Sequence, residues 1–131
     1  MIVVDSNVVA YLYLPGEFTA AAEKLLRREP EWAAPLLWRS ELRNILALYV
    51  RQRLLTFERA FEIQREAEAL LADNEYDVDS FEVLELARDS GCTAYDCEFV
   101  SLAKRLEVKL ITGDAKLRSA FPNFTAPLSI R

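Results

Sequence analysis

Apolar residues recur along the chain in two patterns, short aliphatic runs and longer stripes with a helical period. The short runs, at residues 2–4 and 108–112, end in polar residues and are typical of buried strands. In the longer segments the apolar residues stand three and four positions apart, which predicts amphipathic helices. We expect these helices at residues 7–13, 18–28, 36–53, 57–72, 80–89 and 94–106.

Residues that favour helix starts agree with these boundaries. Thr56, Asp79 and Thr93 each stand immediately before an expected helix, where a side-chain oxygen can accept a hydrogen bond from the first turn. Near the end of the chain, Pro127 cannot donate a backbone hydrogen bond. We therefore expect the tail, residues 126–130, to form an edge strand.

Strands that alternate with helices are typical of an α/β domain around a mostly parallel sheet, and helix should dominate here. The 131 residues fit a single domain, residues 1–131, with little room for a second. Apolar residues make up 52% of the chain and charged residues 28%, so we expect a folded domain in water. The longest uncharged run, residues 6–16, is shorter than the roughly 18 residues that a membrane span needs, so no membrane association is expected.

The chain contains no histidine, and this excludes several catalytic classes. Ser-His-Asp and Cys-His catalysis, an imidazole general base and a His-ligated zinc site are all ruled out. The two cysteines, Cys92 and Cys97, lack the spacing and the second ligand pair of a zinc site. We interpret them as reduced thiols, which favours the cytoplasm. Acid–base or metal chemistry must therefore rely on carboxylates, Lys, Tyr, Cys or water.

Two acidic residues stand at the ends of the expected strands. Asp5 ends the first strand, and Asp114 ends the strand at residues 108–112. If the two strands are parallel neighbours, both carboxylates lie at the same edge of the sheet, where ligands gather in open parallel sheets. Asp is also a favoured N-cap, and each of these residues precedes a helix, so capping is the alternative interpretation.

Glu41 stands out on the long helix expected at residues 36–53. On a helical wheel it falls inside a continuous apolar arc. The arc consists of Leu37, Leu48, Ile45, Trp38, Tyr49, Leu42 and Leu46, and Arg39, Arg43, Ser40, Arg51 and Asn44 occupy the opposite side. A carboxylate on a core-facing stripe is costly to desolvate. Glu41 therefore has a functional role, a buried Arg partner or access to water.

Asp96 borders the apolar arc of its helix, and its alternative role is a capping box with Thr93. Glu98 falls at the other edge of that arc, and we interpret it as a surface residue or an outer support of a site. Four acids in an apolar or edge setting suggest one cluster, in which carboxylates repel one another strongly. A hard divalent cation such as Mg²⁺ or Mn²⁺ resolves the repulsion and can activate water.

Four stretches of the sequence, in this order and spacing, resemble the PIN-domain nucleases, and among them the small VapC-like toxins of prokaryotic toxin–antitoxin pairs. The stretches are VVDSN at residues 3–7, SELRNIL at 40–46, TAYDCEFVSLA at 93–103 and LITGDAKL at 110–117. The resemblance covers essentially the whole chain. It implies a three-layer α/β/α sandwich with a mostly parallel central sheet.

The resemblance also implies an acidic site that binds Mg²⁺ or Mn²⁺ and cuts RNA. Carried over by motif, the catalytic and metal-binding residues are Asp5, Glu41, Asp96 and Asp114, with Asn7 and Thr112 as polar supports. Glu98 is an extra acid near the site. We expect a metal-dependent endoribonuclease, in which a water activated by the metal attacks phosphorus in line. The family's toxins pair with a small antitoxin encoded beside them, so we expect such a protein partner.

The charge of the chain is unusual for a protein that binds RNA. It carries 21 acidic and 16 basic side chains, a net charge of −5, whereas affinity for phosphate usually comes from basic residues. Residues 58–98 hold 13 acidic and 3 basic side chains, and we expect them to form a solvated face or to meet a basic partner. The basic residues concentrate at residues 24–53 and 99–131, two stretches that we expect to flank the site.

Aromatic side chains are more numerous than one small core needs. We therefore expect a two-fold homodimer that buries some of them, because self-association is the usual fate of a large apolar patch. The residues considered are Tyr11, Tyr13, Phe18, Trp32 and Trp38.

Other classes remain as alternatives. A metal-dependent phosphatase of the haloacid-dehalogenase type also has an Asp after its first strand, but Asp5-Ser6-Asn7 lacks that family's second Asp. A receiver domain needs a lysine after a late strand, and Lys116 follows Asp114 rather than replacing it. The non-enzymatic alternative is a PIN-like fold kept only as a catalytically silent binding module.

Overall fold

Five short strands form one sheet in the order β3-β2-β1-β4-β5, and every neighbouring pair is parallel. The structure is a computed structural model and describes residues 1–128. The strands are β1 (Ile2–Val4), β2 (Trp32–Pro35), β3 (Glu75–Tyr76), β4 (Leu110–Ile111) and β5 (Thr125–Ala126). In the central strand, Val3 is paired with Ala33 of β2 on one side and with Leu110 of β4 on the other.

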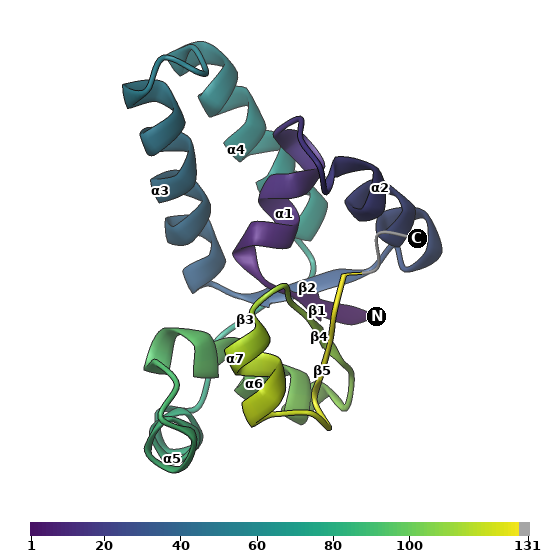
Figure 1. Ribbon diagram of the computed structural model, residues 1–131, viewed down its shortest axis with the longest axis vertical. Helices are drawn as coiled ribbons and strands as arrows, with labels where there is room; N and C mark the ends of the chain where they lie inside the picture. The colour runs from purple at the N-terminus through teal and green to yellow at the C-terminus, as the bar shows by residue number, and fades with distance from the viewer. Residues whose placement is uncertain (129–131) are drawn as a thin grey trace.

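Seven helices in the described part of the chain cover the two faces of this sheet. They are α1 (Ser6–Tyr13), α2 (Thr19–Arg28), α3 (Leu37–Arg51), α4 (Phe57–Leu71), α5 (Ser80–Ser90), α6 (Ala94–Leu106) and α7 (Ala115–Ala120). Figure 1 shows α1 to α4 on one face of the sheet and α5 to α7 on the other. The expected helix-rich, three-layer α/β/α sandwich is confirmed.

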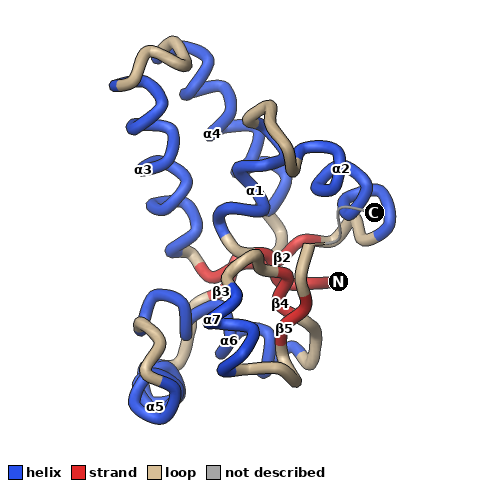
Figure 2. The backbone as a smooth tube through the Cα atoms, viewed as in Figure 1, coloured by secondary structure: helices blue, strands red, loops and turns tan. Residues whose placement is uncertain are grey.

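The expected helix starts are also confirmed by their hydrogen bonds. Thr56 accepts a hydrogen bond from the backbone N–H of Arg59 at the start of α4. Asp79 and Thr93 accept equivalent bonds at the starts of α5 and α6. The hairpin of α3 and α4 extends well away from the sheet (Figure 2).

The strands differ from the sequence-based expectation in two ways. β2 and β3 were not expected, because β2 is rich in Ala and ends in Pro, and β3 has only two residues, so neither shows a strand periodicity. β5 ends at Ala126, so the edge strand lies before Pro127 and not at residues 126–130. Residues 129 and 130 of that expected strand lie outside the described residues.

The core corrects two expectations about apolar residues. Trp32 and Trp38 are both completely buried, so neither tryptophan can contribute to a dimer surface. The buried stripe of α3 is narrower than the apolar arc on the helical wheel and consists of Trp38, Leu42 and Leu46. Leu48 is 44% exposed, because much of α3 lies in the projecting hairpin rather than on the sheet.

A polar network ties α3 to the edge strand β3. Glu75 of β3 accepts two hydrogen bonds from the Arg39 guanidinium, each 2.6 Å long, and one of 2.8 Å from the indole N–H of Trp38. Arg39 also donates to Glu68 of α4 at 3.0 Å. The hydrogen bonds from Arg39 hold the pKa of the Glu75 carboxyl below its usual range. Two helices and one strand are therefore held together by a single guanidinium.

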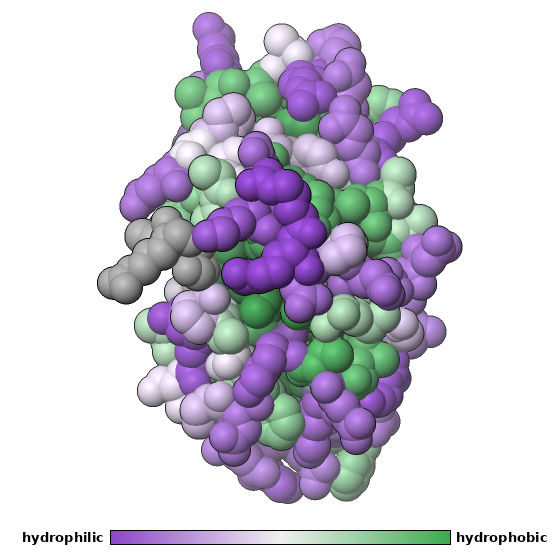
Figure 3. Space-filling view, turned by 90° about the vertical axis from the view of Figure 1, so that its right-hand side faces the viewer, coloured by the Kyte–Doolittle hydropathy of each residue, from purple (hydrophilic) through white to green (hydrophobic). Residues whose placement is uncertain are grey.

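The surface seen in Figure 3 is mostly hydrophilic, with apolar areas between polar side chains. Within residues 1–128, no helix has the length and apolar character needed to cross a membrane. Both cysteines are buried and free, as expected from their spacing.

Replacing Glu75 with Ala should lower the free energy of unfolding by about 1–3 kcal/mol, because the buried indole N–H of Trp38 loses its acceptor. Urea denaturation measures the change. The control is Glu62→Ala, which removes an exposed ion pair with Arg59 and should change stability by less than about 1 kcal/mol. Equal losses from the two substitutions would contradict a structural role for the network.

Candidate active site

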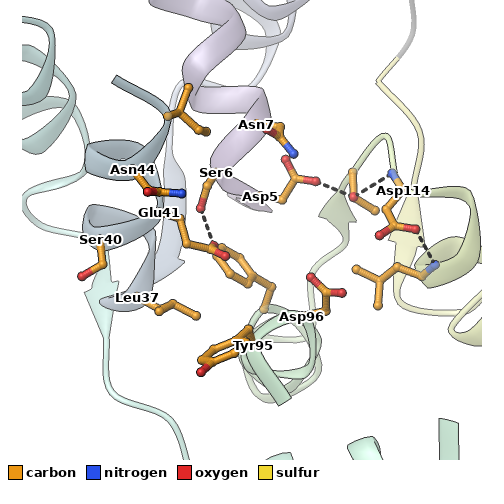
Figure 4. Close-up of a pocket in the computed structure, with 14 residues that line it drawn as sticks. Asp5, Ser6, Asn7, Leu37, Ser40, Glu41, Asn44, Tyr95, Asp96 and Asp114 are labelled. Carbon is orange, nitrogen blue, oxygen red and sulfur yellow. Dashed lines mark hydrogen bonds between the residues drawn. The ribbon is translucent and has the colours of Figure 1, made fainter. Parts of the chain in front are cut away.

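The four acids expected to form a cluster come from four different elements and line one pocket. The pocket has a volume of about 420 Å³ and lies at the edge of the sheet where β1 and β4 end. Asp5 follows β1, Asp114 follows β4, Glu41 lies on α3 and Asp96 on α6. Figure 4 shows their carboxylates around the same space. The sheet topology explains the meeting of Asp5 and Asp114, because β1 and β4 are parallel neighbours.

Asp5 and Asp114 are helix caps and pocket residues at the same time. One oxygen of Asp5 accepts a hydrogen bond of 2.9 Å from the N–H of Val8 in α1. Asp114 accepts one of 3.1 Å from the N–H of Leu117 in α7. The capping alternative is therefore correct for both residues, but it does not compete with a place in the pocket. Capping fixes each carboxylate at the sheet edge and leaves its charge uncompensated by a cation.

Thr112 connects these two acids. Its side chain is completely buried, and its hydroxyl donates a hydrogen bond to the second oxygen of Asp5. The same hydroxyl accepts a hydrogen bond of 3.1 Å from the backbone N–H of Asp114. Thr112 thus orients the side chain of Asp5 and the backbone of Asp114. Asn7, the other expected support, lines the pocket from the first turn of α1 and is exposed.

Glu41 is oriented by a hydroxyl rather than by an arginine. Ser6 donates a hydrogen bond of 2.7 Å to its carboxylate, and no ion pair to Glu41 occurs among residues 1–128. Burial raises the pKa of the Glu41 carboxyl, and the nearby charges of Asp96 and Asp5 raise it further. Of the alternatives for Glu41, the buried Arg partner is therefore wrong. Its side chain faces a pocket instead of the core.

Asp96 has its carboxylate free for the pocket. Its backbone N–H donates to the Thr93 hydroxyl at 3.1 Å, which is half of the capping box considered above. The reciprocal bond is missing, and in the described part of the chain no hydrogen bond reaches the Asp96 carboxylate. Glu98 does not line the pocket, but its charge contributes to the raised pKa of Glu41. Burial also raises the pKa of Glu98 itself.

The electrostatics of the pocket favour a cation. None of the described residues that line it is a lysine or an arginine. Burial raises the pKa of Asp5, and the charge of Asp96 adds to this effect. An added divalent cation would lower the electrostatic cost of ionising Asp5 and Glu41.

The oxygen donors around the pocket suit a hard metal ion. Within residues 1–128, no three acidic or Cys side chains are already arranged to hold one ion. The absence of such a close group is compatible with Mg²⁺, which keeps several waters and usually binds only one or two carboxylates directly. The residues present therefore fit a hydrated Mg²⁺ or Mn²⁺ ion in their chemistry.

Four of the basic residues expected to flank the site have partners other than its four carboxylates. Arg39 and Arg43 of α3 face Glu68 at 3.0 and 3.9 Å. The Lys116 ammonium donates to the carbonyl of Gly91, and Arg118 donates to the backbone carbonyl of Thr112. The stretches that carry the basic residues do contribute elements to the site, but no lysine or arginine of theirs up to residue 128 lines the pocket.

Several pocket residues were missed by the sequence analysis. They are Ser6, Ser40, Asn44 and Tyr95. Ser6 and Tyr95 each adjoin a proposed acid, so their positions beside Asp5 and Asp96 were the available signal. Ser40 and Asn44 were assigned to the solvent side of α3. Since the wheel shows only one helix, it could not reveal that a pocket wall runs along the border between polar and apolar sides.

Comparisons with known proteins give a consistent result along the chain. The family model described as PIN domain matches residues 2–120. The chain is 32% identical to Ribonuclease VapC3 of Pyrobaculum aerophilum over an alignment of 139 residues, gaps included, which covers 96% of this chain and 98% of that relative.

Solved structures with low sequence identity share the fold. The structure of PAE2754 from Pyrobaculum aerophilum has a TM-score of 0.77 and 20% identity, covering 97% of this chain and 83% of that one. A chain of a toxin–antitoxin complex from Klebsiella pneumoniae has a TM-score of 0.73 and 15% identity, covering 100% and 98%. FitAcB from Neisseria gonorrhoeae has a TM-score of 0.71 and 19% identity, covering 99% and 98%.

Glu41→Gln should increase the stability of the metal-free protein at pH 7.5. Burial raises the folded-state pKa of Glu41 above its unfolded value, so ionisation costs folding free energy. The protonated Glu41 carboxyl contributes to folding stability fully below its unfolded-state pKa. That contribution is lost as the pH rises through the folded-state pKa. Gln removes the charge and keeps an acceptor for Ser6.

Urea denaturation in EDTA between pH 4 and 8 tests this expectation. The advantage of Glu41→Gln should shrink as the pH falls through the folded pKa. The matched control is Glu23→Gln on the exposed side of α2, which should show no such pH-dependent gain. An advantage for Glu41→Gln that is independent of pH would show that the charge is not its cause.

Proposed function

The chain belongs to the PIN domain family, and we propose that it is a metal-dependent endoribonuclease that hydrolyses RNA phosphodiester bonds. The observation that carries the proposal is the pocket itself, in which four carboxylates from four elements face one space without a basic residue among the lining side chains. The name of the relative at 32% identity, Ribonuclease VapC3, supports RNA as the substrate.

We assign the metal site to Asp5, Glu41, Asp96 and Asp114, which would bind Mg²⁺ or Mn²⁺ directly or through its waters. A bound ion of this kind supplies Lewis-acid activation of water and offsets negative charge on the phosphoryl oxygens. The protein's own contribution is orientation. Thr112 holds the Asp5 carboxylate and the backbone of Asp114, and Ser6 holds Glu41. With no histidine in the chain, the leaving oxygen takes its proton from solvent.

A protein antitoxin is the partner that we propose in addition to RNA, and the cytoplasm is the proposed compartment. The name of the Klebsiella neighbour, a toxin–antitoxin complex, supports the partner, and two free, buried cysteines suit a reducing compartment. A second pocket of about 180 Å³, between the α1–α2 turn and α3, offers an apolar anchor for such a partner. It lies beside the acidic pocket, and Asn7 and Ile45 line both. Copurification with the product of the adjacent gene tests the pairing.

A homodimer remains part of the proposal, but through a different surface from the one expected. Phe57 and Phe61 of α4 are 69% and 55% exposed at the projecting hairpin. They border a largely apolar groove of about 520 Å³ between α3 and α4. Apolar side chains that border such a groove are a suitable surface for self-association.

Replacing Asp96 with Asn should reduce Mg²⁺-dependent cleavage of RNA by at least about 100-fold, since losing even an outer partner of a metal ligand typically costs 10–100-fold. Glu98→Gln is the matched control and should retain most of the activity, because Glu98 does not line the pocket. Gel assays with unstructured RNA measure both rates. Equal losses would mean that the ligand set is wrong.

Other outcomes of this experiment identify the alternatives. Phosphate release from a small phosphoester, without RNA cleavage, would favour the phosphatase. No cleavage by the parent chain, together with no gain in unfolding temperature on addition of Mg²⁺, would favour the silent binding module.

The double substitution Phe57→Ser and Phe61→Ser should convert the proposed dimer into a monomer at micromolar concentration. Sedimentation equilibrium measures the change. The control is Phe81→Ser, which alters a ring of similar exposure on the opposite face of the sheet and should leave the dimer intact. A parent chain that is already a monomer would overturn the dimer proposal without affecting the nuclease assignment.

A further inference from the structure

Tyr95 is an exposed aromatic residue at the edge of the acidic pocket. Its side chain is 64% exposed, although it lies on the first turn of α6 directly before Asp96. Figure 4 shows its ring at the border of the space that the carboxylates surround. One turn later on the same helix, Phe99 is 3% exposed and anchors α6 in the core. The ring is therefore held at the pocket by a fixed helix.

The Tyr95 ring has no partner in the described part of the chain. The ring–ring contact there joins Tyr11 and Phe18, and the two cation–π contacts involve Phe61 and Tyr76. No hydrogen bond of the described residues involves the Tyr95 hydroxyl. The face of the Tyr95 ring is therefore open to an aromatic group from outside the chain.

The charge of the pocket makes such a ring useful for binding RNA. Four acids and no lysine or arginine line the pocket, so the protein's own contacts there repel phosphate. Stacking of a base on an aromatic side chain is an uncharged source of affinity, worth about 1–3 kcal/mol per base. Stacking of this kind requires an unpaired base, because both faces of a paired base are covered inside a duplex.

We propose that Tyr95 is the stacking platform for an unpaired base adjacent to the bond that is cut. This inference rests on the proposed nuclease function. Tyr95 acts as a positioning residue, because it holds the nucleotide and leaves the chemistry to the acids.

The binding test uses a short RNA in which 2-aminopurine replaces each base in turn. Titrations are made in the Asp96→Asn chain, which keeps the RNA intact. With the probe at one position, its fluorescence should be quenched by the Asp96→Asn chain and equally by the double variant with Tyr95→Phe. Tyr95→Leu should abolish the quenching and weaken binding by about 5- to 150-fold, the range that corresponds to the loss of one stacked base. The control is Phe81→Leu, an equally exposed ring outside the pocket, which should change neither quantity.

The kinetic test uses the otherwise unchanged chain in Mg²⁺. Tyr95→Leu should raise KM and leave kcat within a few-fold, because stacking binds ground state and transition state alike. Tyr95→Phe should restore KM. An RNA with one abasic nucleotide at the quenched position should bind as weakly to the parent as to Tyr95→Leu, because each change removes the same contact.

The outcomes separate this inference from the proposed function. If Asp96→Asn abolishes cleavage while Tyr95→Leu and Phe81→Leu behave alike, the stacking role is overturned and the nuclease assignment stands. If an abasic nucleotide weakens binding to Tyr95→Leu as much as to the parent, the stacking role is likewise overturned. If the parent chain neither binds nor cuts RNA, the proposed function fails and the stacking role fails with it.

Discussion

Burial of carboxylates that no cation compensates, around one pocket, is the constraint on which the rest of the site depends. Burial raises the pKa of Asp5 and of Glu41, and the acidic neighbours of each raise it further. The residues that line the pocket include no cation to offset this charge. A chain that keeps such a cluster ionised gives up stability at neutral pH. The surrounding structure must therefore orient these carboxylates without neutralising them.

Neutral hydrogen-bond donors perform this task. The Thr112 hydroxyl donates to Asp5, and the Ser6 hydroxyl donates to Glu41. Backbone N–H groups in the first turns of α1 and α7 donate to Asp5 and Asp114. Neutral donors orient a carboxylate without cancelling its charge, whereas an arginine at hydrogen-bond distance would neutralise it. The guanidinium of Arg39 instead ties α3 to Glu75, away from the pocket. Neutral donors therefore orient the acids of the pocket, whereas the Arg39 guanidinium stabilises the packing of α3 away from them.

The sequence predicted those parts of the site that depend on local pattern. Asp5 and Asp114 could be placed together because each follows an aliphatic strand and parallel neighbours end at one edge. Glu41 was noticed because a carboxylate interrupts an apolar arc. The network around Glu75 was not predicted, because its partners lie 36 and 37 positions away in sequence and β3 has too few residues to show a period. Local patterns specify elements, whereas contacts between distant elements require the assembled fold.

In the proposed nuclease, the acidic pocket and an RNA substrate would make opposite demands on the same space. Carboxylates attract a cation, but they repel the phosphate that the cation is meant to meet. A ring of arginines would attract RNA, yet it would also pair with the acids and displace the metal. Among residues 1–128, no lysine or arginine lines the pocket, and Tyr95 gives the pocket edge an uncharged aromatic surface. Recognition through the base rather than the phosphate is compatible with a net charge of −5, because stacking does not depend on the sign of the surrounding field.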